Sequence, residues 1–310
     1  INLVKMVRPE KGDFDWDKLR ETVRLSVRFL DNVIDVNRFP LPQIEEMTKL
    51  NRKIGLGVMG WADALLKLWI PYDSEEALKL AERLMSFITK EARQMSVELG
   101  EERGSFPSFD ESVWPSRGFH TLRNATVTTI APTGTISIVA GVTSGIEPLF
   151  AVSFVRNVLE GAKLLEVNST FEEVAKRRGF YSRDLMLQIA RTGSIQEISD
   201  IPSDVKEVFV TALDIEPEWH VRMQAAFQKY TDNAVSKTVN LRQEATVQDV
   251  YQVFMLAWKL KCKGITVYRY GSKREQVLTI RPLELGAAVE EPLTAEAEYA
   301  GGCPTDLCPH

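Results

Sequence analysis

Five consecutive β-branched residues, Thr126 to Ile130, limit most strongly what this chain can fold into. Such a run suits a strand packed on both faces, because branched side chains are stiff and fit a pleated, buried surface. Pro132 then breaks the run, and Gly134 lets the backbone come close to a ligand. The stretch from Asn124 to Pro148 therefore predicts a buried strand that leads into a turn.

The turn carries the groups that an anion site needs. Hydroxyl side chains at Thr133, Thr135 and Ser137 surround the break, and the free amides after Pro132 can point at an anion, as at a helix N-terminus. No lysine or arginine lies between residues 123 and 156, so amides and hydroxyls would hold any anion here. The competing interpretation is an ordinary Pro-Gly turn that leaves a core strand, and spacing alone favours it.

The composition is that of a globular chain. With 310 residues and 44% hydrophobic residues it can bury a full core, as one large domain or two small ones. The net charge of -5 is spread over both signs, so nucleic acid is not an expected partner. No apolar run reaches membrane-spanning length and the first residues form no signal peptide, so no membrane is expected. Three cysteines make no disulfide scaffold, which favours a reducing, cytoplasmic location.

Apolar periodicity predicts mainly helices, with a few strands between them. Apolar residues recur at three- and four-residue steps from Asp15 to Val36, the pattern of a helix with one buried face. Residues 235–270 read as strand, helix and strand, a parallel crossover unit that places the chain among α/β folds. The expected helices cover residues 15–36, 43–53, 73 or 74 to 99 (ended by Gly100), 218–229 and 246–261. Helical patterns dominate 154–191, and 193–217 is expected to be a mixed, loop-rich connection. The expected strands cover residues 1–7, 126–130, 235–241 and 265–270.

Three glycines, Gly55, Gly57 and Gly60, indicate close packing of the backbone. Their spacing also matches the letters of the dinucleotide fingerprint G-x-G-x-x-G. No strand of convincing length precedes them, and the acidic residues at 73–76 belong to the start of the next helix. A dinucleotide site is therefore the weaker interpretation.

Five segments follow one another in the order of a known family, up to Leu278. They are FLDNVIDVNRFP (29–40), KIGLGVMGWADAL (53–65), NATVTTIAPTGTISIVAG (124–141), WHVRMQAAFQKYTDNAVSKTVNL (219–241) and CKGITVYRYGSK (262–273). Together they resemble the C-terminal half of the catalytic chain of ribonucleotide reductases, most closely the adenosylcobalamin-dependent class. The resemblance implies an α/β fold with many helices, in which residues 1–278 form the second half of a ten-stranded barrel made of two parallel five-stranded halves. A flexible tail at 279–310 would follow.

The resemblance also implies a reaction and a substrate site. In the family, a ribonucleotide is reduced at its 2' carbon by cysteine radical chemistry, and the loop that holds the substrate phosphates resembles the turn of this chain. The implied phosphate-binding residues are Ala131, Pro132, Thr133, Gly134, Thr135, Ile136 and Ser137. None of the family's three active-site cysteines can be assigned here, so an N-terminal half, in the same or a separate chain, is an expected partner. Without that half we expect no activity. A homodimer is a further possible assembly.

Two cysteines near the C-terminus, Cys303 and Cys308, follow two glycines and a polar stretch with no apolar period. They are close enough to join as a disulfide, and a metal site would need more ligands than His310 can add. The resemblance implies a redox pair that regenerates the active-site cysteines and is itself reduced by a thioredoxin-like protein. The alternative is two incidental exposed cysteines.

The cofactor follows from one local departure within the resemblance. Iron-dependent members pass a radical through two adjacent tyrosines, whereas here Arg269 separates Tyr268 from Tyr270. This interruption favours adenosylcobalamin, which makes the radical within the site. An iron-dependent large subunit and a non-catalytic nucleotide-binding half-barrel are the alternatives.

Four further polar residues are weaker candidates. We interpret Cys262 as a small buried residue, and His120 and His220 as structural histidines without a ligand partner. Glu147 lies close to the turn in sequence, so it is a candidate for a polar contact there, although a turn-capping role is as good an interpretation.

Overall fold

Five short extended segments run parallel to one another in the computed structural model, which describes residues 1–157 and 163–272. Isolated bridges join Asn2 to Met59, Leu56 to Thr128 and Ile130 to Val235, all parallel. Strand β5 (Thr238–Leu241) continues from the fourth segment and pairs in parallel with β6 (Thr266–Arg269). The order of the segments is therefore 1–3, 54–59, 126–130, 233–241 and 266–269. We call this set the parallel array, and within the described residues it does not close into a barrel.

The β-branched run lies inside this array, as predicted. Val127, Thr128 and Ile130 are buried, and the run is hydrogen-bonded on both sides. Leu56 N–H donates to the Val127 oxygen at 2.8 Å, and Ile130 N–H donates to the Ala234 oxygen at 3.2 Å. The run is thus extended and buried, although it meets its neighbours through single bridges rather than as a long regular strand.

The glycines of the neighbouring segment allow this close approach, which confirms the packing predicted for them. A Cβ on Gly57 would lie 2.2 Å from the Thr129 backbone oxygen, and one on Gly55 would lie 2.6 Å from the Thr129 Cγ2 atom. Only a residue without a side chain fits at either position. The contact accounts for both glycines without a dinucleotide.

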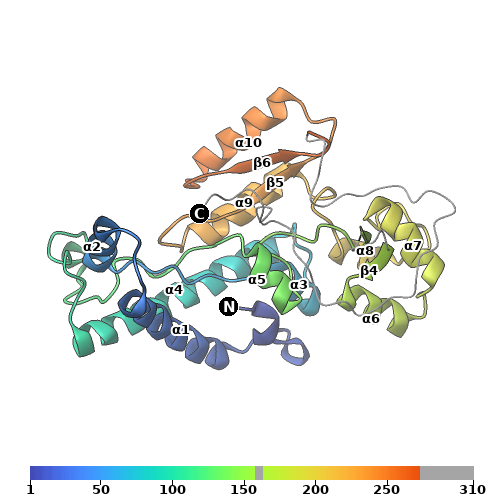
Figure 1. The fold of residues 1–310 in the computed structure, drawn as a ribbon. Helices are drawn as coiled ribbons and strands as arrows, with labels where there is room; N and C mark the ends of the chain where they lie inside the picture. Colours follow the sequence, from blue (N-terminus) through green and yellow to red (C-terminus); the bar gives the residue numbers. More distant parts are fainter. Residues whose placement is uncertain (158–162, 273–310) are drawn as a thin grey trace.

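Helices surround the array (Figure 1). The two long helices, α1 and α4, pack against each other, and α9 packs on both α4 and β5. Their buried faces form the largest core with α3 and the array, while α6, α7 and α8 enclose a second core. The helices are α1 (Trp16–Val36), α2 (Pro42–Asn51), α3 (Trp61–Leu68), α4 (Glu75–Arg103), α5 (Gly134–Ala140), α6 (Ser169–Arg178), α7 (Arg183–Thr192), α8 (Ser203–Val208), α9 (Pro217–Gln228) and α10 (Val247–Lys259).

A buried polar cluster ties α1 to the start of the array. The Asp31 side chain is fully buried, and its Oδ1 atom accepts from Arg52 Nη2 at 2.8 Å and from Asn124 Nδ2 at 3.0 Å. Its other oxygen lies 3.4 Å from Arg103 Nη1 and 3.3 Å from Arg123 Nε. One carboxylate thereby joins four segments that are far apart in sequence.

Two expectations for the first third of the chain are wrong. Residues 1–7 were expected to be a strand, but Leu3–Met6 forms a 3-10 helix because the Asn2 side chain accepts from Val4 N–H at 3.0 Å. Extended backbone there is limited to Asn2 in the parallel array and to the pair β1 (Val7–Arg8) and β2 (Asp13–Phe14). Helix α4 does not end at Gly100. That residue lies against the next segment, where a Cβ would lie 2.4 Å from Thr121 Oγ1, and the helix continues to Arg103.

One further expectation fails between the turn and α9. The helical patterns predicted from residue 154 begin instead with an antiparallel hairpin of β3 (Ser153–Asn157) and β4 (Lys163–Val167), and only then does α6 start. The stretch predicted as a mixed, loop-rich connection contains one short helix, α8, which fits that description. Capping residues mark the real helix starts, since Asn168 and Ser182 accept from backbone N–H groups at the beginning of α6 and α7.

The C-terminal tail from residue 273 onward, with the expected tether and both Cys303 and Cys308, lies outside the described residues. Within the described residues, no helix is long and apolar enough to cross a membrane.

Candidate functional site

The predicted turn lies at the carboxyl edge of the parallel array. Because the segments are parallel, their C-terminal ends share one edge, and ligands of open parallel sheets bind outside this edge. Segment 126–130 leads into the turn and α5, while segment 54–59 leads into Gly60 and α3. Figure 1 shows α5 and α3 as neighbours. The fold therefore brings two helix starts to the edge where a ligand is expected.

The seven predicted residues, 131–137, form one continuous turn and the first part of α5. Thr133 has a left-handed backbone with φ of 55° and precedes the helix, whose first residue is Gly134. Ser137 N–H donates to the Thr133 oxygen at 2.8 Å, which is the first helical bond. The three amides before it, from Gly134 to Ile136, have no intrahelical acceptor by the geometry of a helix start. Most of the turn is exposed, and only Ser137 is buried.

Two of the three predicted hydroxyls hold the turn in shape. Thr133 Oγ1 accepts from Gly145 N–H at 2.7 Å. Ser137 Oγ lies 2.8 Å from Ser144 Oγ and donates to the Gly134 oxygen at 3.1 Å. Thr135 is exposed. Hydroxyls thus serve partly as internal supports, while the amides from Gly134 to Ile136 have no acceptor within the helix.

Sequence reasoning missed the segment that supports the turn, residues 143–147, which we call the brace. At its start, Thr143 N–H donates to Asp63 Oδ2 at 2.6 Å, and the Thr143 oxygen accepts from Gly60 N–H at 2.8 Å. In its middle, Gly145 has a φ of 49°, and a Cβ there would lie 3.0 Å from the Ala131 oxygen. The Tyr72 hydroxyl donates to the Ile146 oxygen at 2.6 Å. The brace is therefore fixed from α3 and from the start of α4.

The end of the brace is fixed by a buried ion pair. Glu147 Oε2 accepts from Lys237 Nζ at 2.6 Å, and Glu147 Oε1 accepts from Thr238 N–H at 2.7 Å. Lys237 also donates to His220 Nδ1 at 2.9 Å and to the Thr238 oxygen. His220 Nε2 donates to the Ala212 oxygen at 3.0 Å, which leaves Nδ1 as the acceptor for the lysine. Glu147 was predicted only as a polar contact near the turn, and His220 was not expected to have a charged partner.

Burial changes the protonation of this cluster. It lowers the pKa of Lys237, while the Glu147 carboxylate acts in the opposite direction. Burial, and then the charge of Lys237, lower the pKa of His220 well below 6.5. Burial raises the pKa of Tyr72 well above 10.0, with Glu147 contributing in the same direction. The short contact pairs the lysine with the glutamate, and the histidine stays neutral near pH 7.

The remaining candidates lie apart from the turn. His120 is exposed, and Cys262 is half-buried, with a pKa raised above 9.0 by burial. Tyr268 and Arg269 are neighbours in β6, so their side chains point to opposite faces of the strand. Among the residues that the structure describes, no group of His, Cys, Asp and Glu side chains is arranged to hold a metal ion.

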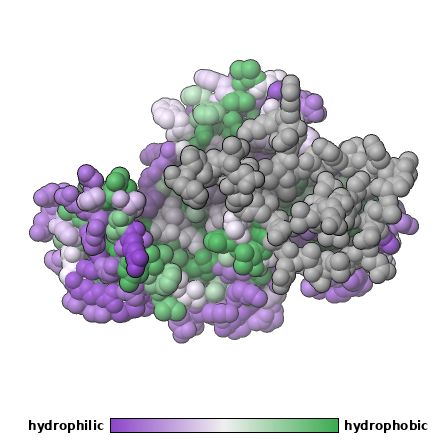
Figure 2. Space-filling model, viewed as in Figure 1, coloured by the Kyte–Doolittle hydropathy of each residue, from purple (hydrophilic) through white to green (hydrophobic). Residues whose placement is uncertain are grey.

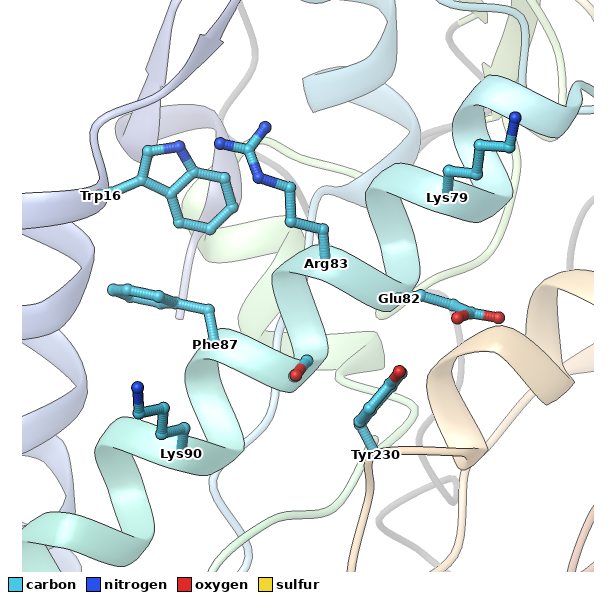
Figure 3. A pocket seen from close by; sticks show the side chains of 8 residues that line it. Trp16, Lys79, Glu82, Arg83, Phe87, Lys90 and Tyr230 are labelled. Atoms are coloured by element: carbon cyan, nitrogen blue, oxygen red, sulfur yellow. The ribbon is translucent and has the colours of Figure 1, made fainter.

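A surface hollow of about 580 Å³ lies on the outer side of α4 (Figure 3). It does not include the turn or the brace. Two of its charged side chains are paired within the protein: Arg83 pairs with Asp13 at 3.0 Å and lies over the Trp16 ring at 4.4 Å, and Glu82 pairs with Lys229 at 2.6 Å. We therefore place the candidate site at the turn rather than in this hollow.

The comparisons with known proteins agree on one family. The family described as "Ribonucleotide reductase, barrel domain" matches residues 1–268. The chain is 50% identical to the vitamin B12-dependent ribonucleoside-diphosphate reductase of Thermoplasma acidophilum over 99% of its own length and 41% of that protein. It is also 50% identical to the protein of that name from Mycobacterium tuberculosis, again over 99% of this chain and 43% of that protein. The chain thus spans about two fifths of the length of these curated relatives.

A solved structure shows the same fold. The class Id ribonucleotide reductase alpha subunit of Actinobacillus ureae superposes with a TM-score of 0.70 over 81% of this chain and 46% of that chain, at 24% sequence identity.

Proposed function

We propose, on the premise that this chain belongs to the ribonucleotide reductase family through its barrel domain, that it is part of an enzyme reducing ribonucleotides to 2'-deoxyribonucleotides. The names of the two relatives, both ribonucleoside-diphosphate reductases, support a diphosphate substrate. The observation that carries the proposal is the exposed turn at the carboxyl edge of the array, whose first helical amides have no intrahelical acceptor and whose shape is supported from within. This geometry suits a substrate phosphate.

In this proposal the amides from Gly134 to Ile136 and the Thr135 hydroxyl bind the phosphates. Each charge-assisted hydrogen bond of this kind is worth about 1.5 to 3 kcal/mol. The replacement Gly134→Val should block the approach of a phosphate to the backbone and weaken pyrophosphate binding by roughly tenfold or more for each bond lost.

The matched control for that replacement is Gly264→Val, because nothing lies within 4 Å of the position of its Cβ. Isothermal titration of the two variants with pyrophosphate is the measurement. Equal affinity of Gly134→Val and the control would remove the turn as the phosphate site.

We propose adenosylcobalamin as the cofactor. The names of the relatives support it, and so does the sequence at β6, where Arg269 separates Tyr268 from Tyr270. When bound, this cofactor supplies a radical from its cobalt–carbon bond. Deoxynucleotide formation that needs added adenosylcobalamin would support the assignment, and activity that needs an iron-containing partner instead would contradict it.

We propose the remaining part of such an enzyme, in the same or a separate chain, as the partner that completes the barrel. Exposed apolar side chains on α10 support a covered surface, since Val247, Tyr251 and Trp258 are 89%, 57% and 72% exposed. Figure 2 shows hydrophobic residues gathered over α10 and over α5. Large exposed apolar patches mark interaction sites. Mixing this chain with the N-terminal half of a relative should give deoxynucleotide formation, while turnover by this chain alone would contradict the proposal.

We propose Cys303 and Cys308 as the redox pair that accepts electrons from a thioredoxin-like protein. With both replaced by serine, the completed enzyme should form about one product equivalent and then stop when the protein reductant is the only electron source. A small dithiol should restart it, because exchange needs only a thiolate with access to the disulfide. Repeated turnover of the double variant with the protein reductant, at the wild-type rate, would show the pair to be incidental.

A further inference from the structure

We infer that Lys237 and Glu147 are positioning residues for the turn: their ion pair fixes the brace, and the brace fixes the amides of Gly134 to Ile136. The inference deepens the proposed function, since it rests on the turn being the phosphate site. It assigns a role to two charged residues that need not touch the substrate.

The first step concerns the carboxylate. Both oxygens of Glu147 are bonded to the segment that leads into β5, one to Lys237 Nζ at 2.6 Å and one to Thr238 N–H at 2.7 Å. Two bonds from one rigid segment leave the carboxyl group a single orientation. The end of the brace is thereby attached to the parallel array.

The second step concerns the lysine. An ammonium group has three protons, and the Lys237 side chain, fully buried, meets three acceptors: Glu147 Oε2, His220 Nδ1 and the Thr238 oxygen. A buried cation whose donors are all used is held in place, and removing it would leave the carboxylate without its partner. Lys237 therefore stabilises the position of Glu147 and is not free to bind a ligand.

The third step leads from the brace to the turn. Gly145 N–H donates to Thr133 Oγ1 at 2.7 Å, and Ser144 Oγ lies 2.8 Å from Ser137 Oγ. Thr133 has a φ of 55°, a left-handed conformation that is strained for a β-branched residue and persists only where surrounding contacts enforce it. The brace supplies these contacts, so loosening the brace should let the turn relax and misdirect its amides.

The charge of Glu147 should also affect phosphate binding at the turn. Glu147 is two residues from Gly145, which contacts the turn, and its carboxylate is 27% exposed. Paired with Lys237 it is neutralised, but alone it would place a negative charge beside a site for an anion. Loss of the lysine should therefore weaken phosphate binding more than loss of both charges together.

Hydrogen exchange of the full 310-residue chain, without ligand, tests the mechanical link. In Lys237→Met the amides of residues 131–141 should exchange at least tenfold faster, while peptides from α4 keep the wild-type rate. Lys229→Met is the matched control, because its lysine pairs with Glu82 at 2.6 Å on the surface and is 57% exposed. It should leave exchange in the turn unchanged.

Glu147→Gln is a second variant, for use if Lys237→Met does not fold. It keeps the shape of the side chain and should accelerate exchange at 131–141 less, by about threefold. Wild-type exchange at 131–141 in a folded Lys237→Met or, failing that, in Glu147→Gln overturns the inference.

Pyrophosphate titration of the same proteins tests the consequence. Affinity should fall roughly tenfold in Lys237→Met and recover in part in the double variant Lys237→Met/Glu147→Gln, while Lys229→Met stays at the wild-type value. If exchange accelerates but affinity does not change, the amides are not being positioned for phosphate and the inference is wrong. If the wild-type chain binds no pyrophosphate although the exchange link holds, the positioning stands and the proposed phosphate site fails.

Discussion

The replacement Asp31→Asn should destabilise the protein more than any other single loss of charge in α1. Asp31 is fully buried, and its two oxygens face Arg52, Arg103, Arg123 and the Asn124 amide. Asparagine keeps one oxygen as an acceptor. Its amide group, however, would replace Oδ2 and point N–H donors at guanidinium donors 3.3 and 3.4 Å away.

The magnitude follows from burial. Removing one partner of a buried ion pair typically costs about 3 to 5 kcal/mol, because the remaining charges stay buried without compensation. Asp35 provides the comparison within the same helix. It accepts from Arg52 Nη1 at 2.7 Å, but its side chain is 46% exposed, and an exposed pair contributes about 0 to 1 kcal/mol. The difference between the two replacements should therefore be about 2 kcal/mol or more.

Urea unfolding at pH 7, followed by circular dichroism, measures this difference. We expect a clear fall of the unfolding midpoint for Asp31→Asn and a small one for Asp35→Asn, with similar slopes. Equal effects of the two replacements, or a cost below about 1 kcal/mol for Asp31→Asn, would show that the buried cluster is not what ties α1 to the array.

Three further predictions concern packing and pH. Gly57→Ala should cost at least about 3 kcal/mol in unfolding free energy, because its Cβ would lie 2.2 Å from a backbone oxygen, whereas Gly264→Ala has free space and should cost little; equal urea midpoints would contradict this. Burial keeps His220 neutral in the folded chain, so below pH 6.5 this histidine binds a proton in the unfolded chain but not in the folded one. Stability should be complete above pH 6.5 and fall below it by up to about 1.4 kcal/mol per pH unit, and a midpoint that does not change between pH 7 and 5 would refute this. Tyr72→Phe removes the bond to the Ile146 oxygen at 2.6 Å and should lower the free energy of unfolding by about 1 to 3 kcal/mol, with a wild-type midpoint as the contrary result.

Local patterns predicted the parts of the fold that depend on local physics. The stripe from Leu19 to Ile34 gave a correct helix, because burial of one face repeats with the helical period. The crossover from β5 through α10 to β6 was also correct, including its parallel direction. The family resemblance correctly implied five parallel segments. The resemblance implied only half of a ten-stranded barrel for this chain, and the described residues form an open array.

The wrong predictions involve contacts that local patterns do not contain. Gly100 looked like a helix end, yet it serves a close approach to Thr121 within a continuing helix. Strand β3 pairs with β4, and this pairing cannot be read from the spacing of apolar residues within β3 alone. The hairpin was missed for that reason. The turn at 131–137 could be predicted because its proline, glycine and hydroxyls are adjacent. Glu147 and Lys237 are 90 residues apart, and only the fold brings them together.

One sequence signal could have pointed to the brace. Gly145 and Glu147 follow the turn after a single short helix, and a glycine beside a carboxylate so close to an anion site is unexpected unless the charge is neutralised elsewhere. On our proposal, a turn that lacks its own lysine or arginine binds phosphate with amides and hydroxyls, and such groups act strongly only when their directions are fixed before the ligand arrives. The cation of this region, Lys237, is bonded to the brace through Glu147. If the turn is the phosphate site, we therefore expect phosphate affinity to depend on the rigidity of the brace rather than on a cation beside the ligand.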